Sequence, residues 1–497
     1  MGRENFFGIY DVIIVGAGYS GTMVAVHLAR ADASLRIALI ERGKNAGRGV
    51  AYGTTDAKHL LNVRADQMGA FPDDVGHFYR WLQHHQSNLD AAGVTDLRPD
   101  AFIPRLVFGD YIQDLLREAC ERSRCLDLIH DEIVDITREN DGAFRLLSRD
   151  GKELRGAQVV LAVGNFPPGT HLGSDKATER PWFSNNPYSA DGRAELAEPG
   201  DILIIGTGLT SLDVLMSLAP IKREGKIHIL SRRGLFPQPH GAIATYPPFF
   251  DFEHLPKTAA ELLRRVRRQV RIAAAEGIDW RPVIDSIRPF NQAIWQNLGF
   301  LEQKRFLRCL RSFWDIHRHR CAPQILAVKE QLEAANRLIC HRGNILDFRP
   351  VENHVEVTYR PRGTQEKRTI VVRQVLSCTG PQPDYRKLDD PLVHHLLERD
   401  LLAPDPLRMG AYTDQEGRVL NQAGEPIHRL YTLGSPRMGS LYESIAVPEL
   451  RGQARDVAKH ILSCRRGLYQ TRVTAARHSD EAEHGTIRKH FVPEGTR

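Results

Sequence analysis

The sequence predicts an α/β fold built from two similar units, and three observations support this. A short apolar run rich in β-branched residues stops at a glycine, and the pattern occurs twice, 190 residues apart. Helix-spaced apolar residues and then another apolar run follow each glycine turn. Strand, glycine turn, helix and strand form one βαβ unit with buried, parallel strands. The first unit uses residues 11–16, 22–30 and 37–40, and the second uses residues 201–206, 210–218 and 227–230.

Length and composition agree with this prediction. A chain of 497 residues is too long for one ordinary core and corresponds to two to four domain-sized units. Apolar residues at 42% and charged residues at 26% are typical of a globular protein rather than a disordered one. The net charge of +6 suits anionic small ligands and requires neither a nucleic acid nor a membrane partner.

Seven cysteines are spread along the chain without a CxxC pair. This disfavours a disulfide scaffold, a zinc ribbon and a dithiol redox enzyme. No apolar run approaches 18 residues, so we predict no transmembrane helix. The first ten residues lead directly into the first strand and leave no room for a signal peptide, so we expect a cytoplasmic protein.

The first glycine turn has the spacing of a dinucleotide-binding motif. Gly16 permits the tight turn, Gly18 lets the backbone approach a pyrophosphate, and Gly21 lets the helix pack closely on the strand. Glu41 follows Gly21 by 20 residues, at the end of the next strand, where a carboxylate accepts hydrogen bonds from a ribose diol. The alternative is a glycine-rich turn without a ligand.

The second turn repeats the motif with Gly206, Gly208 and Ser211, a small residue in place of the third glycine. Its second strand ends in Arg232 and Arg233 rather than in an acid. Paired guanidinium groups suit a 2′-phosphate, so this Rossmann-like unit is predicted to bind NADPH. The alternative is that both arginines form a solvated strand end.

Two dinucleotide sites in one chain imply electron transfer between two cofactors. NADPH delivers a hydride, and its natural acceptor is a flavin, so the first unit is predicted to bind FAD. Two further strands, at 158–163 and 373–378, end in glycine turns, and the second turn supplies Gly380 as a further cofactor-binding candidate. We interpret both strands as crossings between the two sheets.

A helical insertion is predicted between residues 258 and 323, where strand signals vanish and arginine-rich helical patterns replace them. The run at 264–271 is read as a solvated helix face, because the interleaved aromatic residues of a nucleic-acid site are missing. The predicted divisions are as follows: residues 1–200, first part of the FAD domain; 201–380, NADPH domain with the insertion at about 250–325; 381–465, second part of the FAD domain; 466–497, polar tail.

The chain resembles a known family, the bacterial FAD/NAD(P)-binding flavoproteins with two dinucleotide-binding domains. These are in turn distantly similar to flavin-dependent N-hydroxylating monooxygenases. The resemblance extends over roughly residues 8–462, and its last block is long and specific. It is carried by GAGYSG at 16–21, RGVAY at 48–52, HLLNV at 59–63, Met68, SRRG at 231–234, Pro239-His240, WDIHRHR at 314–320 and the block at 430–454.

The resemblance implies roles for several residues. The chain after Gly434 is expected to close over the flavin, with Glu443 and Glu449 either near it or in helix-cap and salt-bridge duty. Residues 62–71 are expected beside the flavin ring, which makes Asn62 and Met68 the flavin-adjacent catalytic candidates. Gln67 precedes Met68 here, the reverse of the order in ornithine-type enzymes, and this counts against an ornithine or lysine substrate.

The HRHR cluster at 317–320 is not expected to bind a metal, because residues two apart do not share a helix face. It is either an anion pocket or a helix C-terminus with favourable cations. Arg64, Arg318 and Arg320 are the candidates for binding a substrate carboxylate.

The function predicted from the resemblance is N-hydroxylation of a small amine or amino acid with FAD, NADPH and molecular oxygen, through a C4a-hydroperoxyflavin. No GxSxG, HExxH or P-loop motif points to another chemistry. The alternatives are an NADPH:flavin oxidoreductase without oxygen insertion and a slow flavin-bound sensor. Neither a nucleic-acid nor a membrane partner is expected, and a homo-oligomer stays open.

Overall fold

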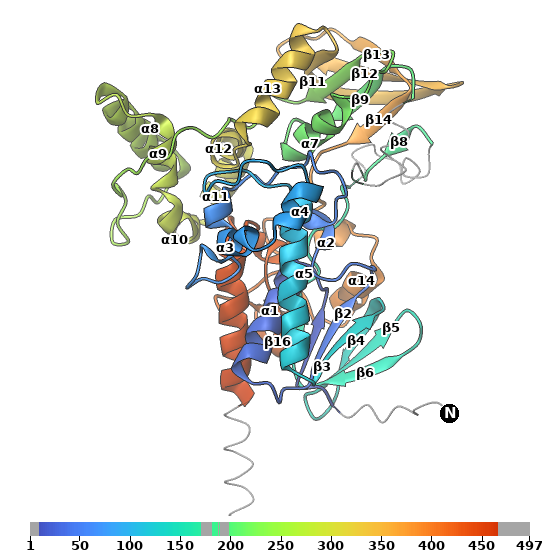
Figure 1. The fold of residues 1–497 in the computed structure, drawn as a ribbon, viewed down its shortest axis with the longest axis vertical. Helices are drawn as coiled ribbons and strands as arrows, with labels where there is room; N and C mark the ends of the chain where they lie inside the picture. Colours follow the sequence, from blue (N-terminus) through green and yellow to red (C-terminus); the bar gives the residue numbers. More distant parts are fainter. Residues whose placement is uncertain (1–8, 170–180, 187, 189–197, 466–497) are drawn as a thin grey trace, which may run out of the picture.

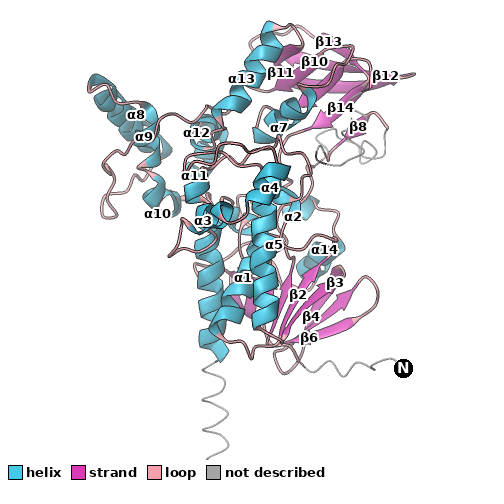
Figure 2. Ribbon diagram, in the orientation of Figure 1, coloured by secondary structure: helices cyan, strands magenta, loops and turns pink. Residues whose placement is uncertain are grey.

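The computed structural model describes residues 9–169, 181–186, 188 and 198–465 of the chain. Two α/β units lie one above the other in Figure 1, and a helical insertion projects to one side of them. Figure 2 shows that the strands are confined to the two units and that the insertion is built from helices. The polar tail predicted for 466–497 lies outside the described residues.

The first unit contains a six-stranded sheet in the order β15-β16-β7-β1-β2-β3. β1 is parallel to β2 and β7, and β16 is parallel to β7, so the chain returns after the second unit to extend the first sheet. The strands are β1 (Val12–Val15), β2 (Ile37–Glu41), β3 (Leu126–His130), β7 (Val159–Leu161), β15 (Arg418–Leu420) and β16 (Pro426–Thr432).

The central strands β1, β2 and β7 are buried on both faces, which is why they are almost wholly apolar. Alternate residues of β1 face two separate cores: Val12 and Ile14 face one, and Ile13 and Val15 face the other. The first core packs against α1 (Tyr19–Ala31), α5 (Arg105–Arg122) and the helix at 447–465. The second packs against a three-stranded sheet and α14 (Pro391–Glu398).

Smaller elements complete this unit. The three-stranded sheet consists of β4 (Ile133–Arg138), β5 (Phe144–Ser148) and β6 (Glu153–Gly156). The short helices are α2 (Gly49–Tyr52), η1 (Ala65–Gln67), α3 (His77–Gln83), α4 (Gln86–Ala91), η4 (Tyr385–Lys387), η5 (Ser435–Arg437) and α15 (Met438–Leu441).

The second unit contains a seven-stranded sheet in the order β13-β12-β11-β10-β9-β14-β8. The helices α7 (Leu209–Leu218) and α13 (Pro323–Ala334) pack on one face of it. The strands are β8 (Phe183–Ser184), β9 (Ile202–Ile205), β10 (Ile227–Ser231), β11 (Leu338–Val351), β12 (His354–Pro361), β13 (Arg368–Val372) and β14 (Gln374–Ser377).

The structure differs from the predicted boundary at residue 201, because β8 pairs with β14 in the second sheet. A strand of two residues has no periodicity, so the sequence offered no signal for it.

The insertion is helical as predicted, with one difference. The second arginine-rich pattern forms two helices that break at Leu310, where no glycine or proline marks the break. The helices are α8 (Ala259–Ala275), α9 (Trp280–Asp285), η3 (Arg288–Phe290), α10 (Asn291–Asn297), α11 (Phe300–Cys309) and α12 (Arg311–Arg318).

Three partly buried histidines predict that the protein loses stability in mild acid. Burial lowers the pKa of His27, His240 and His341 to about 4. The unfolded chain takes up these protons near pH 6.5, so stability is complete above about pH 6.5 and falls as the pH drops towards 4. Each histidine contributes a slope of up to about 1.4 kcal/mol per pH unit in that window.

Chemical unfolding of the variant His27→Phe at several pH values checks this prediction. The His27 ring packs edge-on against Phe71 at 5.8 Å, and none of the described residues forms a hydrogen bond with its Nε2, so phenylalanine keeps the packing and removes the titration. We expect a shallower loss of stability below pH 6.5 than in the wild type. The variant of an exposed histidine, His84→Gln, serves as the control, and equal slopes for all three proteins would contradict the prediction.

Candidate functional site: two glycine turns and the helical insertion

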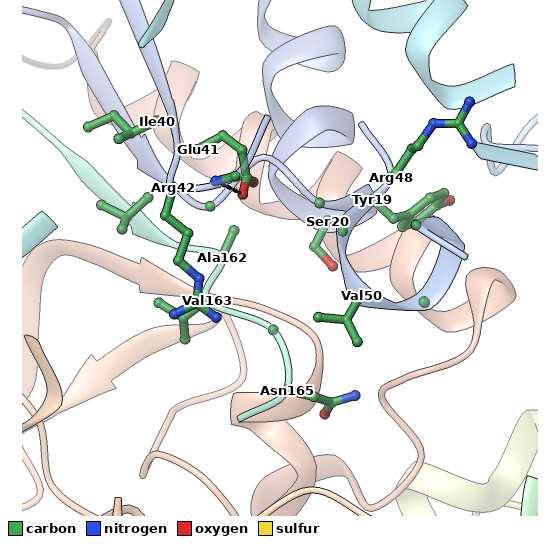
Figure 3. A pocket seen from close by; sticks show the side chains of 18 of the residues that line it. Tyr19, Ser20, Ile40, Glu41, Arg42, Arg48, Val50, Ala162, Val163 and Asn165 are labelled. Atoms are coloured by element: carbon green, nitrogen blue, oxygen red, sulfur yellow. Dashed lines mark hydrogen bonds between the residues drawn. The ribbon is translucent and has the colours of Figure 1, made fainter. Parts of the chain in front are cut away.

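A cavity of about 390 Å³ opens at the carboxyl ends of β1, β2 and β7 (Figure 3). Segments far apart in the sequence form it, because the chain that returns from the second unit closes one side. Its walls include Gly16, Gly18, Tyr19, Ser20, residues 41–45, residues 48–53, residues 131–133 and residues 162–166, together with Ser435, Ile445 and Leu450.

The glycine turn at this cavity has the geometry that a pyrophosphate requires. Gly16 has a φ of +101°, and a Cβ atom there would lie 2.4 Å from the carbonyl oxygen of Ala162. A Cβ on Gly21 would lie 1.9 Å from the carbonyl oxygen of Gly16, so the helix packs directly on the turn. Gly18 faces Gly49, whose added Cβ would lie 3.1 Å from the Gly18 Cα. The backbone therefore stays open to a ligand beside the N-terminus of α1.

The polar groups of the cavity fit a flavin dinucleotide. The Glu41 carboxylate accepts hydrogen bonds from the backbone N–H groups of Ala17 at 3.0 Å and Gly43 at 2.9 Å, which fix it beside the glycine turn. The buried hydroxyl oxygens of Tyr19 and Ser435 have no hydrogen-bond partner among the described residues, and both residues line the cavity. Figure 3 shows Glu41 on one side of the cavity and Val50 with Asn165 on the other.

Two large apolar side chains line the cavity and remain exposed. Val50 is 66% exposed and Ile445 is 45% exposed. A flat apolar ring covering them would remove this surface from water, which is the behaviour expected of a flavin site.

The loop that carries Ile445 is held by a strained turn. Tyr442 has φ 60° and ψ −61°, and the N–H of Glu443 donates to the carbonyl of Leu441 at 2.8 Å, which closes a γ-turn of the rare positive-φ type. The Tyr442 ring stacks on Trp295 of α10, with ring centroids 4.7 Å apart. A strained backbone of this kind persists only where its surroundings fix it, and here the insertion does so.

The buried Glu443 of this loop and the half-buried Glu449 of the helix that follows it both bind the insertion. Glu443, 6% exposed, accepts from the indole N–H of Trp314 at 3.0 Å and from Arg318 at 3.1 Å. Burial alone would raise the pKa of Glu443, but the adjacent Arg318 guanidinium lowers it below its usual range. Glu449 accepts two hydrogen bonds from Arg288, at 2.8 Å and 2.9 Å. Both glutamates are therefore in salt bridges, one of the two roles expected from the sequence.

The second glycine turn lies at the carboxyl end of β9 and repeats the first. Gly206 has a φ of +107°, and an added Cβ would lie 2.4 Å from the carbonyl oxygen of Cys378. A Cβ on Gly208 would meet nothing within 4 Å, so its approach path is open. The fully buried Ser211 hydroxyl donates to the carbonyl of Gly208 at 2.6 Å, which shows how serine serves in place of the third glycine.

The remaining cofactor-binding candidates lie near one or the other of the two glycine turns. Gly380 follows the segment that packs on Gly206, and Gly434 lies beside the first glycine turn, where its added Cβ would be 3.4 Å from Ser20 Oγ. Arg232 is exposed at the end of β10. Arg233 instead turns towards the insertion: its guanidinium lies 5.0 Å from the Phe313 ring centroid and donates to the Arg308 carbonyl at 3.3 Å.

The three arginines proposed for a substrate carboxylate are all engaged with the protein. Arg64 donates to the carbonyl of Gly241 at 2.5 Å, Arg318 binds Glu443, and Arg320 pairs with Asp285. The carboxylate-binding role stays a prediction, and the structure brings the three arginines to the junction of the units and the insertion rather than into the cavity.

Asn62 and Met68 also lie outside the cavity walls formed by the described residues. The Asn62 carbonyl accepts from His240 Nε2 at 3.0 Å, and Met68 is 2% exposed within the first core. Residues 49–53 line the cavity, whereas residues 62–71 do not, so the flavin-adjacent role of Asn62 and Met68 stays a prediction.

Polar contacts join the two units, and the sequence analysis did not predict them. Arg105 of the first unit lies 3.0 Å from Asp213 on α7, which is 1% exposed. The Ser217 hydroxyl, also on α7, donates to Asp56 at 2.6 Å and lies 2.9 Å from His59 Nε2. These residues form contacts only after both units have folded, so no local pattern marks them.

Other chemistries find no support among the described residues. None of their clusters of His, Cys, Asp or Glu could hold a metal ion. All seven cysteines are described, none is in a disulfide, and none lines the cavity. No helix of the described part combines the length and the apolar character needed to cross a bilayer.

Comparison with known proteins agrees with this geometry. A family model described as FAD-NAD(P)-binding matches residues 13–166. This segment carries an FAD-NAD(P)-binding fold. The Escherichia coli (strain K12) protein YdhS is 24% identical over 218 residues, which is 42% of this chain. The match spans 39% of YdhS, well under half of its length.

Solved structures resemble the chain over most of its length. The reduced ornithine hydroxylase PvdA of Pseudomonas aeruginosa (15% identity, TM-score 0.62) covers 91% of this chain and 99% of its own. The ornithine N-hydroxylase KtzI of Kutzneria sp. 744, in a structure with reduced FAD, NADP⁺ and L-ornithine (15%, 0.60), covers 92% and 100%. The bacillithiol disulfide reductase of Staphylococcus aureus (14%, 0.55) covers 91% and 98%.

These comparisons confirm the predicted α/β fold with two Rossmann-like units and the distant similarity to N-hydroxylating flavoenzymes. The predicted flavin and nicotinamide cofactors also agree with them. The chain has the fold of flavin oxidoreductases.

Proposed function

We propose that the protein is an FAD-dependent, NADPH-consuming monooxygenase that N-hydroxylates a small amine or amino acid. The observation that carries the proposal is the contact between the helical insertion and the loop that carries Ile445, beside the candidate flavin cavity. Trp314 and Arg318 bind Glu443, two residues before the cavity-lining Ile445. The likeness to hydroxylases such as PvdA, which extends over 91% of the chain, supports the same conclusion.

The residues present fit FAD. Gly16, Gly18 and the N-terminus of α1 would hold its pyrophosphate, and Glu41 its adenosine ribose. When bound, FAD supplies the hydride acceptor for NADPH and the reduced ring that activates oxygen. Val50 and Ile445 would pack on the ring and keep water away from it.

Disulfide reduction, the activity named for the bacillithiol disulfide reductase, fits this chain less well. None of the seven cysteines lies in a disulfide, and none lines the cavity. Burial raises the pKa of the Cys321 thiol to about 11 and raises that of Cys378 further, so neither forms a thiolate readily. Oxygen is therefore the better supported acceptor of the electrons.

An assay under air tests the proposal. Purified protein is mixed with NADPH and, one at a time, with aspartate, glutamate, ornithine, lysine and putrescine, and NADPH loss, hydrogen peroxide and hydroxylamine products are measured. We expect at least one compound to yield a hydroxylated product with less peroxide than NADPH consumed. Peroxide equal to NADPH consumption with every compound would show an oxidase, and no NADPH loss would show a sensor. The variant Glu41→Ala, expected to lose FAD, reports the background.

A further inference from the structure

A neighbouring strand adds positive charge to the arginine-bearing carboxyl end of β10. Arg342, on the neighbouring strand β11, lies opposite Ser231 in the parallel register. We propose that Arg342 and Arg232 together bind the 2′-phosphate of NADPH and that Arg233 serves the insertion instead. This inference rests on the proposed use of NADPH.

The turn that follows β10 is fixed against the second glycine motif. The Ser231 hydroxyl accepts from the N–H of Gly234 at 2.9 Å and lies 3.0 Å from the hydroxyl of Thr207. Thr207 also donates to the carbonyl of Leu235 at 2.6 Å. Because Thr207 lies between Gly206 and Gly208, these bonds hold the arginine-bearing turn beside the second glycine turn.

Gly234 makes room for the side chain of Arg342. Gly234 has a φ of +64°, and an added Cβ would lie 2.5 Å from Arg342 Cγ, 2.9 Å from Cδ and 3.0 Å from Nε. The Arg342 side chain therefore runs across the turn, within van der Waals distance of its backbone. This contact places a guanidinium from β11 at the turn that carries Arg232.

The charges at this turn lack carboxylate partners. Arg232 and Arg342 are both exposed, and neither forms an ion pair with another described residue. A phosphate dianion would neutralise two such guanidinium groups, and their rigid forks suit its oxygens. A ribose 2′-hydroxyl offers no charge to balance them, so the turn favours NADPH over NADH.

Arg233 has a different environment. Its guanidinium lies over the Phe313 ring of α12 and donates to the carbonyl of Arg308, the penultimate residue of α11. The side chain therefore joins the end of β10 to the insertion. The C-terminal end of a helix such as α11 also favours a nearby cation. The sequence pattern Arg232-Arg233 suggested a pair, but in the turn after β10 Arg233 contacts the insertion while Arg232 is exposed.

Calorimetric binding of two probes to the purified flavoprotein tests this assignment. The probes are 2′,5′-ADP, which carries the 2′-phosphate, and 5′-AMP, which lacks it. We expect Arg342→Ala and Arg232→Ala each to weaken 2′,5′-ADP binding by about 10- to 100-fold, the range for a hydrogen bond to a charged group, and to leave 5′-AMP binding unchanged. Arg342→Lys should recover part of the loss.

Two further variants separate this assignment from a general effect of charge. Arg360→Ala removes an exposed arginine on β12, the next strand of the same sheet, and should leave both probes unaffected. Arg233→Ala should weaken 2′,5′-ADP binding much less than Arg342→Ala. Wild-type binding by Arg342→Ala would overturn the inference and leave the proposed function standing. A wild-type protein that does not prefer 2′,5′-ADP to 5′-AMP would instead remove its NADPH component.

Discussion

Replacing Arg318 by alanine is expected to destabilise the protein by about 3–5 kcal/mol, the range for a buried ion pair that loses one partner. Glu443 is 6% exposed, and without Arg318 its carboxylate would lose a guanidinium partner and keep the indole N–H of Trp314 at 3.0 Å. The loop that carries Ile445 would lose one of its contacts with the insertion, so flavin should also be released more readily. Denaturant unfolding and the flavin content after gel filtration measure the two effects.

Two control variants make this prediction specific. Arg349→Ala breaks the exposed pair with Glu356, in which Arg349 is 69% exposed, and should cost less than about 1 kcal/mol. The double variant Arg318→Met with Glu443→Leu removes both buried charges and should recover most of the stability. A loss for Arg318→Ala no larger than that for Arg349→Ala would contradict the prediction.

Gly206→Ala and Gly208→Ala are expected to fail in different ways, although they belong to one motif. A Cβ on Gly206 would lie 2.4 Å from the Cys378 carbonyl oxygen at a φ of +107°, so β9 and β14 would have to separate. We expect a loss of stability of several kcal/mol, on the order of 3, from the clash and the strained backbone. A Cβ on Gly208 meets nothing within 4 Å, so that variant should fold normally.

The Gly208→Ala variant should nevertheless bind NADPH at least about tenfold more weakly, because its methyl group occupies the path by which a pyrophosphate approaches the backbone. Thermal unfolding separates the two variants, and NADPH titration of the folded Gly208→Ala protein measures the second effect. The interpretation would be wrong if Gly206→Ala were as stable as the wild type, or if Gly208→Ala bound NADPH normally.

The sequence predicted the parts of this protein that depend on neighbours along the chain. Both glycine turns, the strands before them and Glu41 have local signatures, because a parallel strand buried on both faces is apolar throughout and a tight turn requires glycine. The fold class followed from these elements and is confirmed. The break at Leu310 and the two-residue β8 carry no such signature, so they appeared only in the structure.

The candidate site was less predictable, because its contacts join distant segments. Glu443 and Arg318 are 125 residues apart, and each has many partners of opposite charge to choose from in the sequence. Arg342 was missed because its relation to Arg232 depends on the register of β10 and β11. Arg233 was read together with Arg232 because adjacent residues look like a pair, although in the turn after β10 the Arg233 side chain contacts the insertion.

The polar contacts between the two units bear on how the protein would turn over in the proposed reaction. The half-buried Arg105 pairs with the buried Asp213, and Asp56 and His59 lie within hydrogen-bond distance of the Ser217 hydroxyl on the same helix. A hinge motion that separated the second unit from the first would have to break all of these contacts at once. In the proposed reaction, the nicotinamide dinucleotide should therefore enter and leave while the two units stay docked.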